Sequence, residues 1–151
     1  MNALTRRFTA AVLVALLALA AGCATVQMAS PEDDARGKTF AVRAGKANLY
    51  VYRNETFGAA IPMTVSLDGR VAGQSAAQTY FLFEVDPGTH EVASHAEDAS
   101  TLKVTAEAGK SVYVWQEVKM GFWMARSLLQ QVDEETGRKG VAECTRAKSN
   151  F

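Results

Sequence analysis

The stretch from residue 46 to about residue 132 alternates apolar and polar side chains with a period of two, and this pattern constrains the fold most. In ANLYVYR, residues 47–53, Leu49 and Val51 point to one face while Tyr50 and Tyr52 point to the other. Turn residues recur about every eight to twelve positions, as in all-β sandwiches and barrels. The pattern therefore predicts an all-β fold, a small antiparallel β-sandwich of about seven strands.

The quoted stretches that carry this alternation define the expected strands. They span residues 47–53, 62–69, 79–88, 89–97, 101–109, 110–121 and 122–132. Asp68 and Gly69 are a good residue pair for a two-residue hairpin turn. After the last expected strand, Asp133 is placed to cap a short C-terminal helix. We expect this helix to end near Arg146 and Lys148. The predicted domain spans residues 46–151.

The first residues have a different character. Arg6 and Arg7 precede an unbroken apolar run from Ala10 to Ala21, followed by Gly22 and Cys23. This order is typical of a secretory signal peptide. At about 1.5 Å per residue the run covers roughly 18 Å, short of the roughly 30 Å hydrocarbon core, so a permanent membrane span is not expected.

Residues 19–23, LAAGC, resemble a bacterial lipobox. The resemblance implies that residues 1–22 are a lipoprotein signal peptide and that Cys23 becomes the acylated first residue of the mature chain. An ordinary secretory signal with an incidental cysteine is the alternative. Three acyl chains at about 0.8 kcal/mol per buried methylene would make the anchor effectively permanent. Residue 24 is alanine rather than the aspartate that retains such proteins at the inner membrane, so we expect the periplasmic face of the outer membrane.

Residues 23–45 hold few large apolar side chains, and we interpret them as the lipidated N-terminus and a tether. A flexible chain of about 20 residues has a root-mean-square span near 25 Å. One ordered piece is expected inside it, because Ser30 can cap a short helix with Pro31 at its first position. Acidic residues 32–34 suit the positive first turn, and Gly37 would end the helix.

Four stretches resemble one family: GKANLYVYR (45–53), VSLDGRVAG (65–73), YFLFEVDPGTHEV (80–92) and AGKSVYV (108–114). They are similar to bacterial lipoproteins grouped as domain of unknown function 2846, and more loosely to PEGA-type surface β domains. The resemblance covers roughly residues 44–132 and implies a small β-sandwich on a lipid anchor. Its motifs are turns and strand faces, so they indicate a fold rather than an activity.

Residues typical of reaction chemistry are few. The chain has two histidines, and His90 and His95 project to opposite faces of one predicted strand, which excludes joint metal binding. We expect His90 to stabilise the Pro87–Gly88 turn and His95 to lie on the surface. No nucleophile-elbow, zinc-protease or phosphate-loop motif occurs. We therefore predict no catalytic residue, no metal site and no cofactor.

Several other side chains could belong either to a functional site or to the fold itself. The carboxylates Glu84, Asp86, Glu91 and Glu97 could supply a glycosidase pair, but a solvated sheet face is favoured. Tyr50, Tyr52, Tyr113 and Trp115 could form a stacking platform, but core packing is favoured. Cys144 is expected to be a small buried hydrophobic residue, with an intermolecular disulfide as the alternative.

Phe122 and Trp123 are the best candidates for an exposed apolar patch that contacts a partner or the membrane, although a buried strand start is favoured. Lysine plus arginine and aspartate plus glutamate both number 16, so the charge does not favour nucleic acid as a partner.

The resulting hypothesis is a non-enzymatic envelope lipoprotein, held to the membrane by its lipid, that binds or scaffolds a protein, peptidoglycan or another envelope component. Its oligomeric state is left open. The alternative is a hydrolase of envelope glycan or peptide whose site is assembled across the fold. A concave pocket with converging polar groups would distinguish the alternative from the favoured hypothesis.

Overall fold

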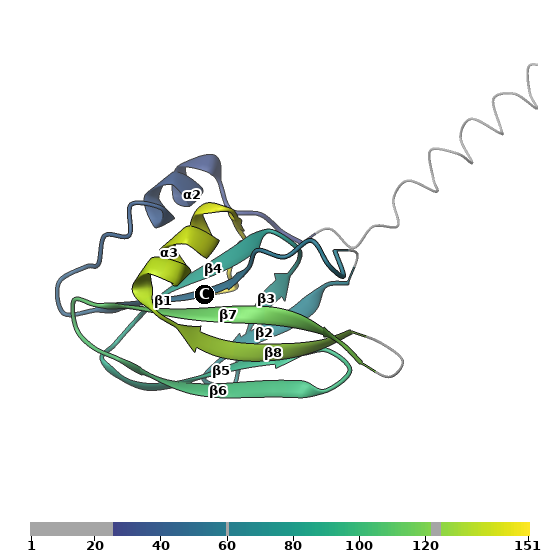
Figure 1. The fold of residues 1–151 in the computed structure, drawn as a ribbon. Coiled ribbons are helices and arrows are strands. Elements are labelled where there is room, and N and C mark those ends of the chain that lie inside the picture. Colours follow the sequence, from purple (N-terminus) through teal and green to yellow (C-terminus); the bar gives the residue numbers. More distant parts are fainter. Residues whose placement is uncertain (1–25, 60, 122–124) are drawn as a thin grey trace, which may run out of the picture.

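The structure, a computed structural model, describes residues 26–59, 61–121 and 125–151. They form two packed sheets and two helices (Figure 1). The larger sheet has the strand order β8-β7-β1-β4-β9, and the smaller sheet has the order β3-β2-β5-β6. The elements in chain order are α2 (Pro31–Gly37), β1 (Ala47–Arg53), β2 (Met63–Leu67), β3 (Arg70–Ser75), β4 (Thr79–Val85), β5 (Gly88–His95), β6 (Ala99–Ala106), β7 (Ser111–Met120), β8 (Ala125–Val132), α3 (Glu134–Ala142) and β9 (Thr145–Arg146).

The predicted β-sandwich with a short C-terminal helix is confirmed. Side chains from both sheets fill the space between them, and Leu49 and Val51 of β1 lie in this core. Tyr50 and Tyr52, on the opposite face of β1, lie in a second buried cluster. Figure 1 shows α3 lying over that face of the larger sheet. Every residue of β1 is therefore buried, because the sandwich covers one face and the helix covers the other.

The larger sheet is mixed rather than purely antiparallel. β1 pairs with β7 in parallel, and β4 pairs with β9 in parallel. Parallel neighbours cannot be joined by a tight hairpin, so their pairing leaves no local turn signal in the sequence. The two strands of the β1–β7 pair were predicted as neighbours within an antiparallel fold, but their parallel direction was not predicted.

Two strands were missing from the prediction, β3 and β9. In β3 the sequence RVAGQS lacks apolar alternation, and the register against β2 shifts between Val65 and Ser66. The turn before β3 is as predicted: Asp68 and Gly69 both have positive φ, 50° and 78°, which a two-residue hairpin of this type requires. An edge strand such as β3 needs only one buried face, and Ala72 supplies it.

The C-terminal helix begins as predicted and ends earlier. Asp133 caps α3 by accepting a hydrogen bond from the Thr136 N–H at 2.9 Å. The helix stops at Ala142, so the expected extension to Arg146 and Lys148 is wrong. Beyond it the chain pairs with β4 as β9, where its main-chain groups find sheet partners instead of helical ones.

Residues 26–45 pack on the sandwich where the sequence predicted a tether. Val26 contacts the main core, and Met28 forms a β-bridge with Ala147. The predicted helix is present as α2, with Ser30 accepting a hydrogen bond from the Asp33 N–H at 3.1 Å. These anchor points are single residues far apart in the sequence, so no periodicity reveals them. The expected free span of about 25 Å is therefore not found in this segment.

The chain also closes both sides of the sandwich. On one side, the Leu129 N–H of β8 donates to Ser100 Oγ of β6 at 3.1 Å. On the other, the C-terminal tail joins β3, where the Asn150 N–H donates to the Ala72 carbonyl at 2.8 Å. Exposed strand edges are thereby covered.

Candidate functional site

Three predicted site residues, Cys23, Phe122 and Trp123, lie outside the described residues, as does the predicted signal peptide 1–22. The structure begins at Val26, which is partly buried against the core. Only Ala24 and Thr25 separate it from Cys23 in the sequence. A lipid on Cys23 would therefore be joined almost directly to the folded domain.

The two histidines lie apart and each has its own partner. The His90 ring lies between two acceptors, with Nδ1 2.7 Å from Asp68 Oδ2 and Nε2 2.8 Å from the Asp86 carbonyl. The contact with Asp86 lies beside Pro87, where the prediction placed it, but Pro87 is a bend and Gly88 already begins β5, so the predicted Pro87–Gly88 turn is not formed. His95 is exposed, as predicted, and its Nε2 lies 3.0 Å from Ser66 Oγ. Within the described ranges, no group of His, Cys, Asp and Glu is arranged to hold a metal ion.

The weighed carboxylates and aromatics take the structural roles that were favoured. Glu84 pairs with Arg43 at 3.2 Å, and Asp86 pairs with Lys46 at 2.6 Å. Tyr50 and Tyr113 stack beneath α3, and Tyr52 and Trp115 pack in the same cluster, so the favoured core packing is confirmed for these four aromatic residues.

Cys144 is also buried, as predicted. Its side chain is 2% exposed, and burial raises the pKa of its thiol to about 12. Its Sγ contacts the Arg53 carbonyl at 3.5 Å.

Two open hollows flank the contact between α2 and the larger sheet. They have volumes of about 470 Å³ and about 400 Å³, and Arg36 and Arg146 line both. The first also includes Asp33, and the second includes Arg43 and Glu84. We treat these two hollows as the candidate site and call them the α2 hollows.

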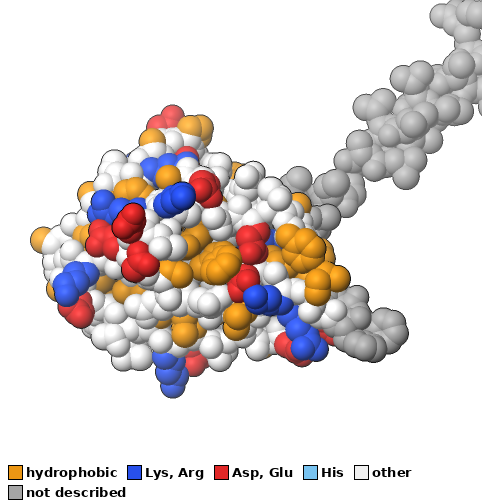
Figure 2. Space-filling view, viewed as in Figure 1, with side chains coloured by type: hydrophobic (Ala, Val, Ile, Leu, Met, Phe, Trp, Pro, Cys, Tyr) orange, Lys and Arg blue, Asp and Glu red, His pale blue; other side chains and the backbone are white. Residues whose placement is uncertain are grey.

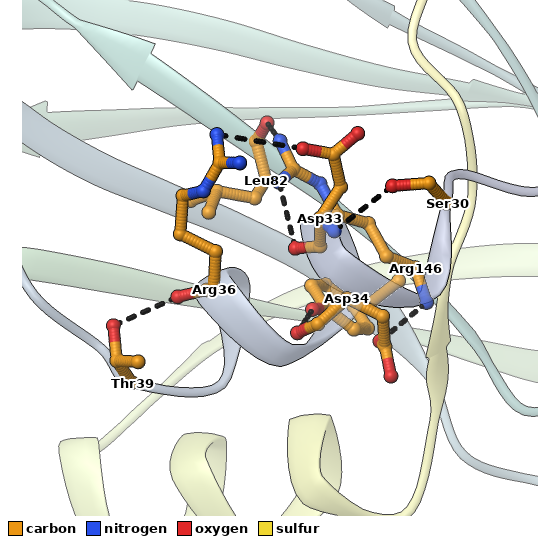
Figure 3. A network of polar contacts seen from close by, with 8 residues as sticks. Ser30, Asp33, Asp34, Arg36, Thr39, Leu82 and Arg146 are labelled. Carbon is orange, nitrogen blue, oxygen red and sulfur yellow. Dashed lines mark hydrogen bonds and ion pairs between the residues drawn. The ribbon is translucent and has the colours of Figure 1, made fainter.

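Arg146 holds the centre of the α2 hollows (Figure 3). Its Nη1 donates to the Asp33 carbonyl at 3.1 Å and its Nη2 to the Leu82 carbonyl at 3.4 Å. The guanidinium thus ties α2 to β4 through main-chain oxygens, and no ion pair of Arg146 with a carboxylate is among the described contacts. Arg36 lies at the rim, 3.5 Å from Asp33 and largely exposed.

Asp34 fixes the same helix from its other side. Its carboxylate accepts from the Arg146 N–H at 2.8 Å and from Lys38 at 3.0 Å. Burial tends to raise the pKa of the Asp34 carboxyl, but these hydrogen bonds outweigh it and hold the pKa below its usual value. Two buried hydroxyls add to the contact, since Tyr80 donates to the Asp34 carbonyl and Tyr50 to the Gly37 carbonyl.

The lining of the α2 hollows, with two arginines common to both, suits a polar ligand. Each has one carboxylate among its lining residues, so neither has the pair of carboxylates that glycoside hydrolysis uses. Sequence reasoning missed this site because Arg146 and Asp33 are 113 positions apart. Only the cap at Ser30 and the acidic first turn of α2 were visible as local signals.

A second polar cluster is enclosed between the sheets. Gln116 Nε2 donates to Ser94 Oγ at 2.6 Å, and Ser75 Oγ donates to Gln116 Oε1 at 2.6 Å. The three side chains are almost fully buried. They satisfy one another, as buried polar groups must, and so join β3, β5 and β7 across the sandwich.

Comparison with known proteins gives two matches. The family described as "Protein of unknown function (DUF2846)" matches residues 43–127, from just before β1 into β8. An "Uncharacterized protein" of Haemophilus influenzae is 31% identical over 145 residues, covering 95% of this chain and 86% of that protein. No solved structure gives a significant match. The family match covers β1 to β7 and the start of β8 but leaves out α2, α3 and β9, whereas the match to the relative includes nearly the whole chain.

Proposed function

Because the chain belongs to the DUF2846 family, whose description assigns no activity, we propose its function from the molecule itself: a lipid-anchored lipoprotein of the bacterial envelope that binds or scaffolds another envelope component without catalysing a reaction. The observation that carries the proposal is the position of Cys23. It ends a lipobox-like sequence, and Val26, three positions later, packs against the core.

The lipid would be the membrane attachment. No helix in the described part of the chain is long and apolar enough to cross a bilayer. Ala24 follows the cysteine in place of an aspartate retention signal, which supports the periplasmic face of the outer membrane.

The α2 hollows are the proposed binding surface. β9 pairs with Thr79 and Tyr80 of β4, and beyond that pairing Leu82 and Glu84 line the second hollow. An extended peptide segment suits a strand edge of this kind, because main-chain hydrogen bonds provide affinity there. Arg36 and Arg43, both exposed, could pair with its acidic groups.

The anchor is tested by comparing Cys23→Ala with Cys144→Ala in intact cells, since the chain has only these two cysteines. We expect mass spectrometry of the purified protein to find an acylated residue 23 and no leader. Cys23→Ala should leave the membrane fraction, whereas Cys144→Ala should stay there. Unchanged fractionation of Cys23→Ala would contradict the proposal.

The binding surface is tested by photo-crosslinking in intact cells. A photoreactive residue is placed at Arg43 in the second hollow, and a matched one at exposed Lys103 on β6 serves as the control. The expected result is one envelope component captured from position 43 and not from position 103, with capture reduced in an Arg36→Ala background. Equal capture from both positions would count against the α2 hollows.

One observation favours the hydrolase alternative, the Ser66 hydroxyl 3.0 Å from His95 Nε2. A serine next to a histidine is the first half of a nucleophilic site. Neither residue lines the α2 hollows. A fluorophosphonate probe that labels the purified protein, and no longer labels Ser66→Ala, would establish the hydrolase and overturn the non-enzymatic proposal.

A further inference from the structure

Three large apolar side chains are exposed at one end of the sandwich. Phe57 and Ile61 belong to the loop between β1 and β2, and Met120 ends β7; they are 51%, 37% and 77% exposed. We call these three residues the apolar end. Exposed apolar groups that gather in one place mark a contact with a partner or a membrane.

A buried arginine holds the loop of the apolar end in shape. The Arg53 guanidinium is enclosed and donates to the Gly58 carbonyl at 2.6 Å and to the Ile61 carbonyl at 2.8 Å, with a longer contact of 3.4 Å to the Phe57 carbonyl. Both apolar residues of the loop are therefore presented by main chain that one buried cation organises.

The same loop is fixed to the strand that ends in Met120. Glu55 Oε2 accepts the Val118 N–H at 2.8 Å, and an added Cβ on Gly58 would lie 3.2 Å from the Val118 side chain. Val118 packs with Met63 and Ala125 in a small buried cluster. The loop, the end of β7 and the start of β2 thus form one packed end of the domain.

The N-terminal segment enters the domain toward this end. Val26 lines a hollow together with Gly73 and Gln74 of β3. These two residues pair with Val65 and Thr64 of β2, close to the residue at which β2 starts. Figure 1 shows the described chain beginning on the side toward which β7 runs, and Figure 2 shows hydrophobic side chains gathered there, on the right of the view.

The distance to the proposed anchor then limits what can cover the apolar end. Cys23 precedes Val26 by three positions, so even a fully extended chain places their Cα atoms at most about 11 Å apart. Apolar groups of interfacial proteins enter the boundary between headgroups and acyl chains by about 5–10 Å. From this reach we infer that the apolar end rests in the bilayer surface and orients the domain, an inference that depends on the proposed lipid anchor.

Charged side chains near the apolar end have partners within the domain, Glu55 through the Val118 N–H and the others in ion pairs. Lys119 pairs with Glu117, and Arg126 pairs with Asp98 at 3.1 Å. The contact with lipid is therefore apolar rather than electrostatic, and added salt should leave it unchanged. The membrane contact would also orient the α2 hollows, which lie where α2 contacts β4 and β9, relative to the bilayer.

The inference is tested with the full lipidated protein in vesicles of phosphatidylethanolamine and phosphatidylglycerol. An environment-sensitive fluorophore is attached to Ile61→Cys or Met120→Cys. The matched control is Val71→Cys, which replaces an exposed apolar residue, 54% exposed, next to the Asp68–Gly69 turn at the other end of β3. Labels at 61 and 120 should shift to shorter emission wavelengths and be quenched several-fold more strongly by lipids with brominated tails than the label at 71.

The outcomes separate the two proposals. If residue 23 is acylated and all three labels emit as in water, the membrane contact is overturned and the anchor stands. If residue 23 is unmodified, the anchor fails and the membrane contact fails with it. Labels at 61 and 120 that shift to shorter wavelengths in vesicles but are not quenched by brominated lipid tails indicate contact with a protein partner or a second copy, and also overturn the inference. Adding Met120→Asp should weaken quenching at position 61 while leaving the far-ultraviolet circular dichroism unchanged.

Discussion

At the residue scale, the buried and half-buried polar side chains of this protein mostly bind main-chain carbonyls. Arg53 organises the β1–β2 loop in this way, and Arg146 joins α2 to β4. A guanidinium presents several donors in a fixed plane and so can satisfy carbonyls from different segments at once. These arginines are structural joints, and their removal should be felt as lost stability.

Arg53→Met should lower the free energy of unfolding by about 3 kcal/mol, because it leaves buried carbonyls without a donor. The loop around Phe57 should also become more sensitive to proteolysis. Chemical denaturation checks the first effect and limited proteolysis the second. Arg126→Met, which removes an exposed ion-paired arginine, is the control and should change stability by less than about 1 kcal/mol. Equal losses in both variants would contradict the role of Arg53.

His90 should make stability depend on pH. Partial burial opposes its charge, but the Asp68 carboxylate and the Asp86 carbonyl outweigh burial and raise the pKa of His90. Since the folded pKa is the higher one, the stabilisation is complete below the unfolded pKa of about 6.5 and is lost as pH rises through the folded value.

His90→Gln should therefore cost more at about pH 5.5 than at about pH 8, and less than about 1 kcal/mol because Asp68 is partly exposed. Thermal unfolding of both proteins across this range measures the difference. The His95→Gln variant serves for comparison. A cost of His90→Gln that grows toward high pH would show that the ring is neutral in the folded state.

At the element scale, α3 is placed by two glycines rather than by helix propensity. A Cβ on Gly137 would lie 2.2 Å from Cγ of Tyr113, and one on Gly140 would lie 2.1 Å from Cε2 of Tyr52. Each glycine costs about 1 kcal/mol relative to alanine in a helix. Because the two glycines lack side chains, the helix can approach the face of the larger sheet that carries the tyrosines. The burial of that face compensates for the lost helix propensity.

Gly137→Ala should consequently lower the free energy of unfolding by about 1–2 kcal/mol. The cost of overpacking, about 1–3 kcal/mol, outweighs the gain in helix propensity. The Tyr113 atoms involved are near its main chain, so they cannot move aside easily. Lys139→Ala, at an exposed position of the same helix, should be nearly neutral. Unfolding in denaturant gives both values; a more stable Gly137→Ala would mean that α3 lies farther from the sheet.

At the scale of the whole molecule, the segment around Gln27 and the C-terminal tail close the sandwich together. The Lys148 N–H donates to the Gln27 carbonyl at 2.8 Å, and the Phe151 ring stacks on Phe83 at 5.7 Å between centroids. The N-terminal segment, the C-terminal tail and β3 therefore support one another. Attachment to the membrane at Cys23 would act directly on this side of the fold.

Removing residues 148–151 should lower the free energy of unfolding by about 2 kcal/mol, from the lost hydrogen bonds and the aromatic contact. The β3 amides should exchange with solvent faster, while those of β7, which lies between β8 and β1 in the larger sheet, should not. Hydrogen exchange followed by mass spectrometry distinguishes the two strands. Phe151→Ala alone should show part of the loss, and unchanged exchange in β3 would contradict the closure.

The sequence by itself determined the elements whose signals are local. Alternation predicted the strand 47–53, and the residue pair Asp68–Gly69 predicted the turn that follows β2. The capping residues Ser30 and Asp133 predicted where the two helices begin. Each of these signals depends on neighbours only a few positions away. The lipobox-like residues before Val26 are a signal of the same local kind.

Only the tertiary structure decided the rest. The parallel β1–β7 pairing, the edge strand β3, the packing of residues 26–45 and the meeting of Arg146 with α2 join segments as far apart in the sequence as Gln27 and Lys148. Such contacts need one or two side chains that fit a surface made elsewhere, so they leave no period in the chain. They become visible only when both segments are folded, since packing and not local propensity stabilises them.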